Sequence, residues 1–207
     1  MVLLAAACGV LGWRWLRTGR YRRPDEGGPL PRHLWVAGVA PFVGLVVERG
    51  LVDRTWPVLL APLALALAGL VLAAVDADVH RLPNAITLPL VPVQTVLLTV
   101  ASAATGDWGA LARAGLAALL VGGGTVLLAF VLFGRSIGMG DAKLMVSIAP
   151  TLAWLGWSTL AVGVWLGFVI GGLAALGLLV TRRAQRSTHL AFGPYLVAGA
   201  VLAVALA

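Results

Sequence analysis

Gly138-Met139-Gly140-Asp141-Ala142-Lys143 joins two long apolar runs, residues 111–133 and the run that begins at Leu144. Gly138 and Gly140 carry no side chains, so another part of the backbone can approach this stretch closely. Asp141 then stands where a helix would begin, and there its oxygens can cap free backbone N–H groups. A carboxylate at a membrane boundary is a candidate functional group, and a plain capped loop is the alternative.

The composition of the chain indicates an integral membrane protein. Of its 207 residues, 60% are hydrophobic and 11% are charged, whereas a soluble domain carries about 25% charged residues. The apolar runs approach the ~20 residues that a spanning helix needs, and they lack the alternation of barrel strands. The net charge of +7 indicates orientation and contact with anionic membrane lipids, so no nucleic-acid partner is expected.

Eight apolar segments predict an all-α, polytopic membrane helix bundle of about eight transmembrane helices. The expected segments are residues 2–16, 34–47, 57–75, 85–104, 111–133, 142–154, 159–180 and 194–207. The glycines at 122–124, in the middle of the fifth segment, would let a neighbouring helix pack closely or would bend their own helix. Two regions are expected: residues 1–56, with the N-terminal helices and a basic cytoplasmic loop, and residues 57–207, the membrane-embedded core.

The basic residues predict which loops are cytoplasmic. All but three of the 15 Lys and Arg residues lie in, or at helix ends next to, the loops after odd-numbered segments; the exceptions are Arg49, Arg54 and Arg113. The positive-inside rule therefore makes the odd loops cytoplasmic and turns both chain ends outward. Asp76, Asp78 and Asp141 then share the cytoplasmic side.

Carboxylates on different helices at one depth can form a catalytic pair, here Asp141 with Asp76 or Asp78. Two carboxylates held close together cannot both ionise easily, so they share one proton. The ionised member can take a proton from water while the protonated member donates to the carbonyl oxygen of a scissile bond. This chemistry predicts hydrolysis of a peptide bond without a metal or another cofactor.

Other chemistries fit these residues less well. His33, His80 and His189 all fall in predicted loops, and no Gly-x-Ser-x-Gly motif occurs. His80 with Asp76 and Asp78 could bind a metal, but a single loop offers a thin set of ligands. Two other function classes remain open: a proton-coupled membrane transporter, and a non-catalytic scaffold in which the aspartates only cap helices. A proton relay would need acidic groups at mid-span, and segments two to eight have none there.

Three stretches together resemble the type IV prepilin peptidase family. Asp76-Ala77-Asp78-Val79-His80-Arg81-Leu82-Pro83-Asn84 resembles its first motif, in which an aspartate precedes Leu/Ile-Pro-Asn/Asp at a fixed spacing. Residues 138–143 resemble its Gly-x-Gly-Asp motif followed by lysine, and residues 191–195, Ala-Phe-Gly-Pro-Tyr, resemble its late Phe-Gly-Pro motif. The resemblance covers roughly residue 57 to the end of the chain.

The resemblance implies an aspartic endopeptidase of the cell membrane that removes the basic leader of prepilins or pseudopilins at the cytoplasmic face. Asp76 and Asp141 match the catalytic pair. The positions implied to bind substrate or shape the site are Asp78, Pro83, Asn84, Gly138, Gly140, Lys143, Gly193 and Pro194. Asp78 can also be interpreted as a solvated interfacial charge, and Lys143 as a lysine that binds lipid headgroups. The expected partners are a single-pass precursor and membrane lipids.

The chain departs from the longer family members near its front. They carry a cysteine-rich zinc segment after the first helix, associated with N-methylation of the new amino terminus. Residues 17–33 contain no cysteine, and Cys8 is the one cysteine of the sequence. The resemblance therefore implies a short, peptidase-only form in which methyltransferase activity is not expected.

Overall fold

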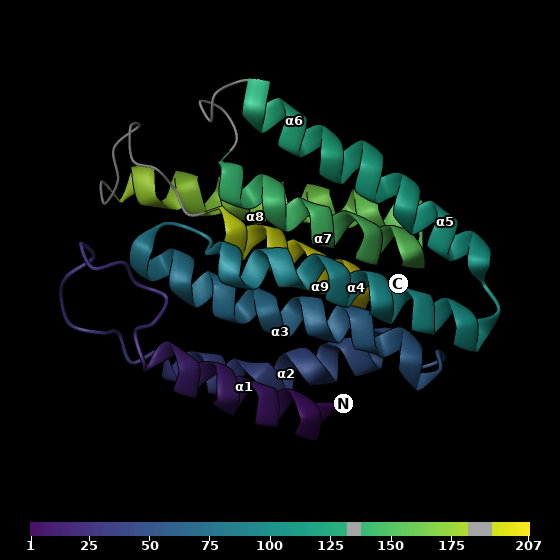
Figure 1. Ribbon diagram of the computed structural model, residues 1–207, viewed down its shortest axis with the longest axis horizontal. Helices are drawn as coiled ribbons and strands as arrows, with labels where there is room; N and C mark the ends of the chain where they lie inside the picture. The colour runs from purple at the N-terminus through teal and green to yellow at the C-terminus, as the bar shows by residue number, and fades with distance from the viewer. Residues whose placement is uncertain (132–137, 182–191) are drawn as a thin grey trace.

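The computed structural model describes residues 1–131, 138–181 and 192–207, and these residues are mostly helical. The helices are α1 (Val2–Leu16), α2 (Leu34–Gly50), α3 (Trp56–Val79), α4 (Asn84–Thr105), α5 (Trp108–Ala117), α6 (Gly124–Val131), α7 (Met139–Leu155), α8 (Trp157–Val180) and α9 (Gly193–Ala205) (Figure 1). A π-helix, η1 (Ala118–Gly123), joins α5 to α6 without a break. Counting α5, η1 and α6 as one, the described residues form eight helices, which confirms the predicted all-α bundle.

Four helices are long and apolar enough to cross a membrane: α3, α4, the continuous helix Trp108–Val131, and α8. Large apolar side chains stay exposed on these helices, among them Phe130, Trp165 and Leu173. A helix that is apolar on its outer face as well as its inner face is suited to lipid. The protein is therefore a multi-pass membrane helix bundle.

Successive helices run in opposite directions, so their connections alternate between the two ends of the bundle (Figure 1). Residues 17–33 and 80–83 lie at one end, together with the first residues of α7 and α9. Residues 51–55 and 106–107 lie at the other end. This alternation gathers all three sequence motifs at one end of the bundle.

The first motif is more helical than the sequence predicted. α3 continues beyond the expected end at residue 75, so Asp76 and Asp78 lie in its last turn and not in a loop. The helix ends at Val79. The next residue, His80, has a left-handed backbone (φ 51°), and its N–H donates to the Asp76 carbonyl at 2.9 Å. Pro83 then holds extended backbone in front of α4 (φ −69°, ψ 133°), and its ring favours that φ. The motif thus becomes a short turn between two helix ends.

Helices α3 and α9 lie at the centre of the bundle. Helix α3 packs against α1, α2, α4, α7 and α9, and α9 packs against α2, α3, α7 and α8. Helices α8 and α9 approach to backbone contact, because a Cβ built on Gly199 would lie 2.4 Å from the Gly167 nitrogen. The regions predicted as 1–56 and 57–207 are in contact through the packing of α2 on α3 and α9.

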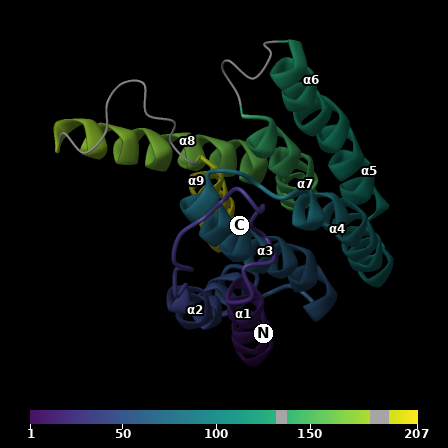
Figure 2. The same ribbon diagram turned by 60° about the vertical axis from the view of Figure 1, so that its left-hand side comes forward.

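The continuous helix α5–η1–α6 packs against α7, and its middle glycines explain how. A Cβ built on Gly122 would lie 2.9 Å from the Val146 Cα, so the glycine lets α7 approach closely, as predicted. Arg113 donates to the carbonyls of Ala153 and Trp154 at the end of α7. Helix α6 contacts α7 and η1, whereas α8 contacts α7 and α9, and Figure 2 shows α6 and α8 diverging. Helices α6 and α8 therefore do not pack against each other in the described ranges.

Candidate active site

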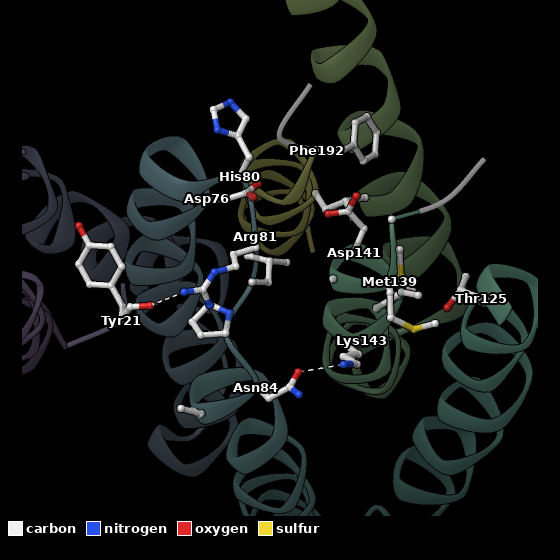
Figure 3. A pocket seen from close by; sticks show the side chains of 18 of the residues that line it. Tyr21, Asp76, His80, Arg81, Asn84, Thr125, Met139, Asp141, Lys143 and Phe192 are labelled. Carbon is white, nitrogen blue, oxygen red and sulfur yellow. Dashed lines mark hydrogen bonds between the residues drawn. The ribbon is translucent and has the colours of Figure 1, made fainter. Parts of the chain in front are cut away.

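A cavity of about 1140 Å³ opens at the end of the bundle where the motifs meet. Its charged lining residues are Arg20, Arg22, Arg23, Asp76, Arg81, Asp141 and Lys143. Its apolar lining comes from η1, α7, α8 and α9 and includes Val121, Met145, Val164, Phe168 and Leu196. The cavity is therefore lined by basic side chains from the loop of residues 17–33 and by apolar side chains from the helices, and Figure 3 shows part of this lining.

Asp76 is a buried carboxylate without a complete set of partners. Its residue surface is only 5% exposed, and its Oδ2 atom has no hydrogen-bond partner within the described part of the chain. Leaving a buried carboxylate oxygen without a partner costs free energy, so packing alone does not explain the residue. Deeper in the described bundle, the buried polar side chains are neutral: Thr87, Gln94, Ser102, Ser147 and Thr151.

Asp141 lies in the first turn of α7 and turns toward the cavity. The N-cap position is Gly138, and no side chain makes a capping hydrogen bond there. The expectation that Asp141 caps this helix is therefore wrong. Its Oδ2 lies 3.2 Å from the position that a Cβ on Gly138 would take, so Gly138 leaves room for the carboxylate.

The two carboxylates meet at the first turn of α9. A Cβ built on Gly193 would lie 3.3 Å from Asp76 Oδ2 and 3.5 Å from Asp141 Oδ1. Asp76 Oδ2 and Asp141 Oδ1 are thus no further apart than the sum of these two distances. Gly193, which has no side chain, lies between them. In Figure 3 the carboxylates lie on either side of the start of α9. Pro194 follows in that first turn, where its missing N–H costs no helical hydrogen bond.

Two further contacts hold the first and second motifs together. A Cβ built on Gly140 would lie 3.2 Å from Leu82 Cβ, so the glycine allows the turn before α4 to rest on the start of α7. Lys143 Nζ donates to Asn84 Oδ1 at 2.8 Å (Figure 3). Pro83, Asn84, Gly140 and Lys143 all line the cavity. The structure thus brings these predicted residues into one group with Asp76 and Asp141.

Asp78 lies outside that group. Its carboxylate pairs with Arg22, with Nη2 2.7 Å from Oδ1 and Nε 2.8 Å from Oδ2, and the Tyr21 hydroxyl donates to Oδ2 at 2.6 Å. The Asp78 side chain is 8% exposed, so it is a buried ion pair and not a solvated charge. Burial, followed by the hydrogen bond to Asp78, raises the pKa of Tyr21 to about 12, which keeps the phenol a donor.

The loop of residues 17–33 is attached to the first motif at a second place. Arg81 donates to both oxygens of Glu26 at 2.7 and 2.8 Å, and its Nη2 also donates to the Tyr21 carbonyl at 2.8 Å. The hydrogen bond from Arg81 holds the pKa of Glu26 down to about 2. The sequence assigned Arg81 only to orientation and did not single out Tyr21, Arg22 or Glu26 as partners. The only signal for these ion pairs in the sequence was the presence of acidic residues in or near a basic loop.

The histidines and a metal site were the other candidates from the sequence. His33 is buried, with its Nε2 3.3 Å from the Tyr21 hydroxyl, and burial lowers the pKa of its imidazole. Within the described ranges, no three His, Cys, Asp or Glu side chains are grouped so that they could hold a metal. His189 and Ala191, the first residue of the third motif, lie outside the described residues.

Comparison with known proteins shows which family the chain resembles. Residues 63–176, more than half of the chain, match the type IV leader peptidase family. A protein of Aeromonas salmonicida (strain A449) named prepilin leader peptidase/N-methyltransferase is 31% identical over 190 residues, which cover 90% of this chain and 62% of the relative.

Proteins with the same name from other bacteria are similar. The Aeromonas hydrophila protein is 32% identical over 191 residues, 90% of this chain and 62% of the relative. The Burkholderia pseudomallei (strain K96243) protein is 33% identical over 149 residues, 68% of this chain and 44% of the relative. The chain therefore spans less than two thirds of the length of these relatives. No solved structure matches the chain.

Proposed function

The chain belongs to the type IV leader peptidase family, and we propose that it hydrolyses the peptide bond after the basic leader of a prepilin or pseudopilin. Asp76 and Asp141 are the proposed catalytic residues. The observation that carries this assignment is their approach to one point, the Cβ position of Gly193, from two different helices. No cofactor enters the proposal.

The proposed reaction uses the two carboxyl groups and one water. One carboxylate takes a proton from the water while the protonated partner donates its proton to the carbonyl oxygen. The water oxygen bonds to the carbonyl carbon and forms a tetrahedral intermediate. The C–N bond then breaks as the first carboxyl protonates the leaving amine, and the second takes back a proton as the carbonyl re-forms. The pair ends in its starting protonation state, so it turns over without another reagent.

We further propose that the substrate is a single-pass precursor whose apolar helix enters from the membrane between α6 and α8. The cavity is lined by Val121 and Thr125 on one side and by Val164 and Phe168 on the other. Helices α6 and α8 make no contact with each other in the described ranges. An apolar helix from the bilayer would bury its side chains there, while the exposed outer faces of the bundle contact membrane lipids.

We also propose how the protein is oriented in the membrane. The end of the bundle that carries Asp76 and Asp141 also carries residues 17–33, which contain five arginines: Arg17, Arg20, Arg22, Arg23 and Arg32. The positive-inside rule favours the cytoplasmic side for such a loop, so the active site would face the cytoplasm. These residues contain no cysteine, and we propose leader cleavage alone for this chain.

The test is cleavage of a prepilin by the purified protein in liposomes. Asp76→Asn and Asp141→Asn should each lower the rate by about 10²–10⁴-fold, because each removes a proton-transfer group at nearly constant size. The double variant should be no slower than the slower single variant, since the pair acts as a unit. Asp53→Asn, an exposed carboxylate at the other end of the bundle, is the matched control. Normal cleavage by both single variants would refute the assignment.

A further inference from the structure

Residues 17–33, here named the α1–α2 loop, are held against the first motif by a buried set of polar contacts. Arg22 binds both oxygens of Asp78, and Tyr21 donates to the same carboxylate. Arg22 also donates to the carbonyls of Gly28 and Pro29 at 3.0 and 3.3 Å. One arginine therefore ties the loop to α3 and closes the loop on itself.

The contacts of Arg22 and Tyr21 with Asp78 are partly shielded from water. The Arg22 and Asp78 side chains are 12% and 8% exposed, and Tyr21 is 4% exposed. A bidentate arginine–carboxylate pair fixes orientation as well as distance. Removing one partner of a shielded pair leaves the other charge uncompensated, which is strongly destabilising. The loop is thus attached far more firmly than a surface ion pair would attach it.

The attachment points lie close to the catalytic candidate in the chain. Asp78 is two positions after Asp76 on α3, and the two side chains leave the helix in different directions. Arg81, which holds Glu26 and the Tyr21 carbonyl, lies in the turn that leads to α4. The loop is therefore attached at two places close after Asp76, one in the last turn of α3 and one in the turn before α4.

The loop forms one wall of the active-site cavity. Arg20, Tyr21, Arg22 and Arg23 line it, whereas Asp78 does not. The side chains of Arg20 and Arg23 make no hydrogen bond or ion pair with other described residues, and both are exposed. Guanidinium groups donate several hydrogen bonds and accept none, so they suit the carbonyl oxygens of an extended peptide.

We propose that Asp78 and Arg81 are positioning residues, which hold the α1–α2 loop as a wall of the substrate site so that the loop binds the carbonyl oxygens of the extended substrate backbone beside the scissile bond. This inference rests on the proposed peptidase activity. Because the contacts reach neither Asp76 nor Asp141, losing them impairs substrate binding and leaves the proton transfers intact.

The test combines two measurements on the full-length protein in detergent and liposomes. Trypsin cleaves after arginine where the backbone can open, so its rate in the α1–α2 loop reports release of the loop without any need for peptidase activity. Steady-state cleavage of a prepilin separates KM from kcat. The variants are Asp78→Asn, Tyr21→Phe and Asp78→Glu, and the control is Asp25→Asn, an exposed carboxylate in the same loop.

In Asp78→Asn, trypsin should cut the α1–α2 loop faster by roughly tenfold or more, since hydrogen bonds to charged groups are lost. The KM for the prepilin should rise by roughly tenfold or more for the same reason. Its kcat should stay within about twofold of wild type, because only uniform binding is removed. Asp78→Glu should restore part of both effects, and Asp25→Asn should show neither. If Asp78→Asn does not fold, Tyr21→Phe, which loses the hydroxyl contacts with Asp78 and His33 but keeps the Arg22–Asp78 pair, should show the same pattern more weakly.

Two results would overturn the inference. Faster trypsin cleavage with an unchanged KM would show that the loop does not bind substrate. A loss of kcat at constant KM would assign Asp78 to the chemistry. An absence of prepilin cleavage by the wild-type protein, with the trypsin pattern as expected, would instead refute the peptidase proposal and leave the attachment of the loop standing.

Discussion

A methyl group added at Gly193 should stop peptide cleavage and leave the bundle folded. The new carbon of Gly193→Ala would lie 3.3 Å from Asp76 Oδ2, 3.4 Å from Leu82 Cδ1 and 3.5 Å from Asp141 Oδ1. Only the first contact is tight, and a shift of a few tenths of an ångström relieves it. We expect an overpacking cost of about 1 kcal/mol, at the low end for added methyl groups, partly offset by the roughly 1 kcal/mol preference of helices for alanine over glycine.

The effect on catalysis should be much larger than the effect on folding. The methyl group fills the space that separates the two carboxylates, where the attacking water and the scissile carbonyl must fit. The carboxylates need to shift by only a few tenths of an ångström, but the water and the carbonyl must move out of the space that the methyl group takes. A displacement of reacting groups by about 1 Å lowers the rate about 100-fold, which corresponds to roughly 2.7 kcal/mol in the barrier. We therefore expect kcat/KM to fall at least about 100-fold while the melting temperature stays close to that of the wild type.

Two other glycines provide matched controls for the same substitution. A Cβ on Gly172, on the outer face of α8, meets no atom within 4 Å, so Gly172→Ala should change neither activity nor stability for the worse. A Cβ on Gly199 would lie 2.4 Å from the Gly167 nitrogen, so Gly199→Ala should lower the melting temperature. The measurements are initial rates in liposomes and thermal unfolding in detergent. A wild-type rate for Gly193→Ala would refute the reasoning, because the first turn of α9 would then not lie between the reacting groups.

The remaining predictions concern orientation, pH and substrate. Reporter fusions after Gly109 and after Thr181 should report opposite sides of the membrane; the same side for both would contradict the topology. The hydrogen bond from Arg81 lowers the pKa of Glu26 from its ordinary value of 4.5 to about 2. Glu26 therefore contributes stability that is complete above pH 4.5 and is lost as the pH falls toward 2. The difference in melting temperature between wild type and Glu26→Gln should accordingly be constant from about pH 8 to 5 and shrink below that; a constant difference down to about pH 3 would refute the role of this pair. Finally, a soluble peptide that carries the leader but lacks the apolar helix should be cleaved poorly, because remote binding is lost, and cleavage equal to that of the full precursor would argue against helix docking.

The architecture followed from the sequence because lipid imposes simple rules. Every spanning backbone must satisfy its own hydrogen bonds, so long apolar runs become helices, and their order alone decides which loops share an end. Asp76 and Asp141 could be placed at one end of the bundle in this way. The motif glycines predicted close approach there, and Gly138, Gly140 and Gly193 each leave space that the structure uses.

The parts that sequence did not predict depend on contacts between distant segments. Asp78 at the end of a helix has the pattern of a solvated charge, and only the fold brings Arg22 and Tyr21 to it. The expected capping role of Asp141 was wrong because α7 starts earlier than the apolar pattern indicated. Gly138 takes the N-cap position, and Asp141 is therefore already inside the first turn, free to face the cavity.

The π-helix η1 makes the helix beside the cavity tolerant of a change in length during evolution. Each N–H in a π-helix bonds five residues back, so the segment holds one residue more than an α-helix of equal span. Deleting the codon for Leu119 would remove that extra residue and restore regular α-helix of the same span. A deletion from a regular α-helix turns everything beyond it by about 100°, whereas here α6 would keep its rotation, and Thr125, which lines the cavity, would still face it. A single in-frame deletion at η1 would thus shorten the chain and preserve the entrance, with both aspartates untouched.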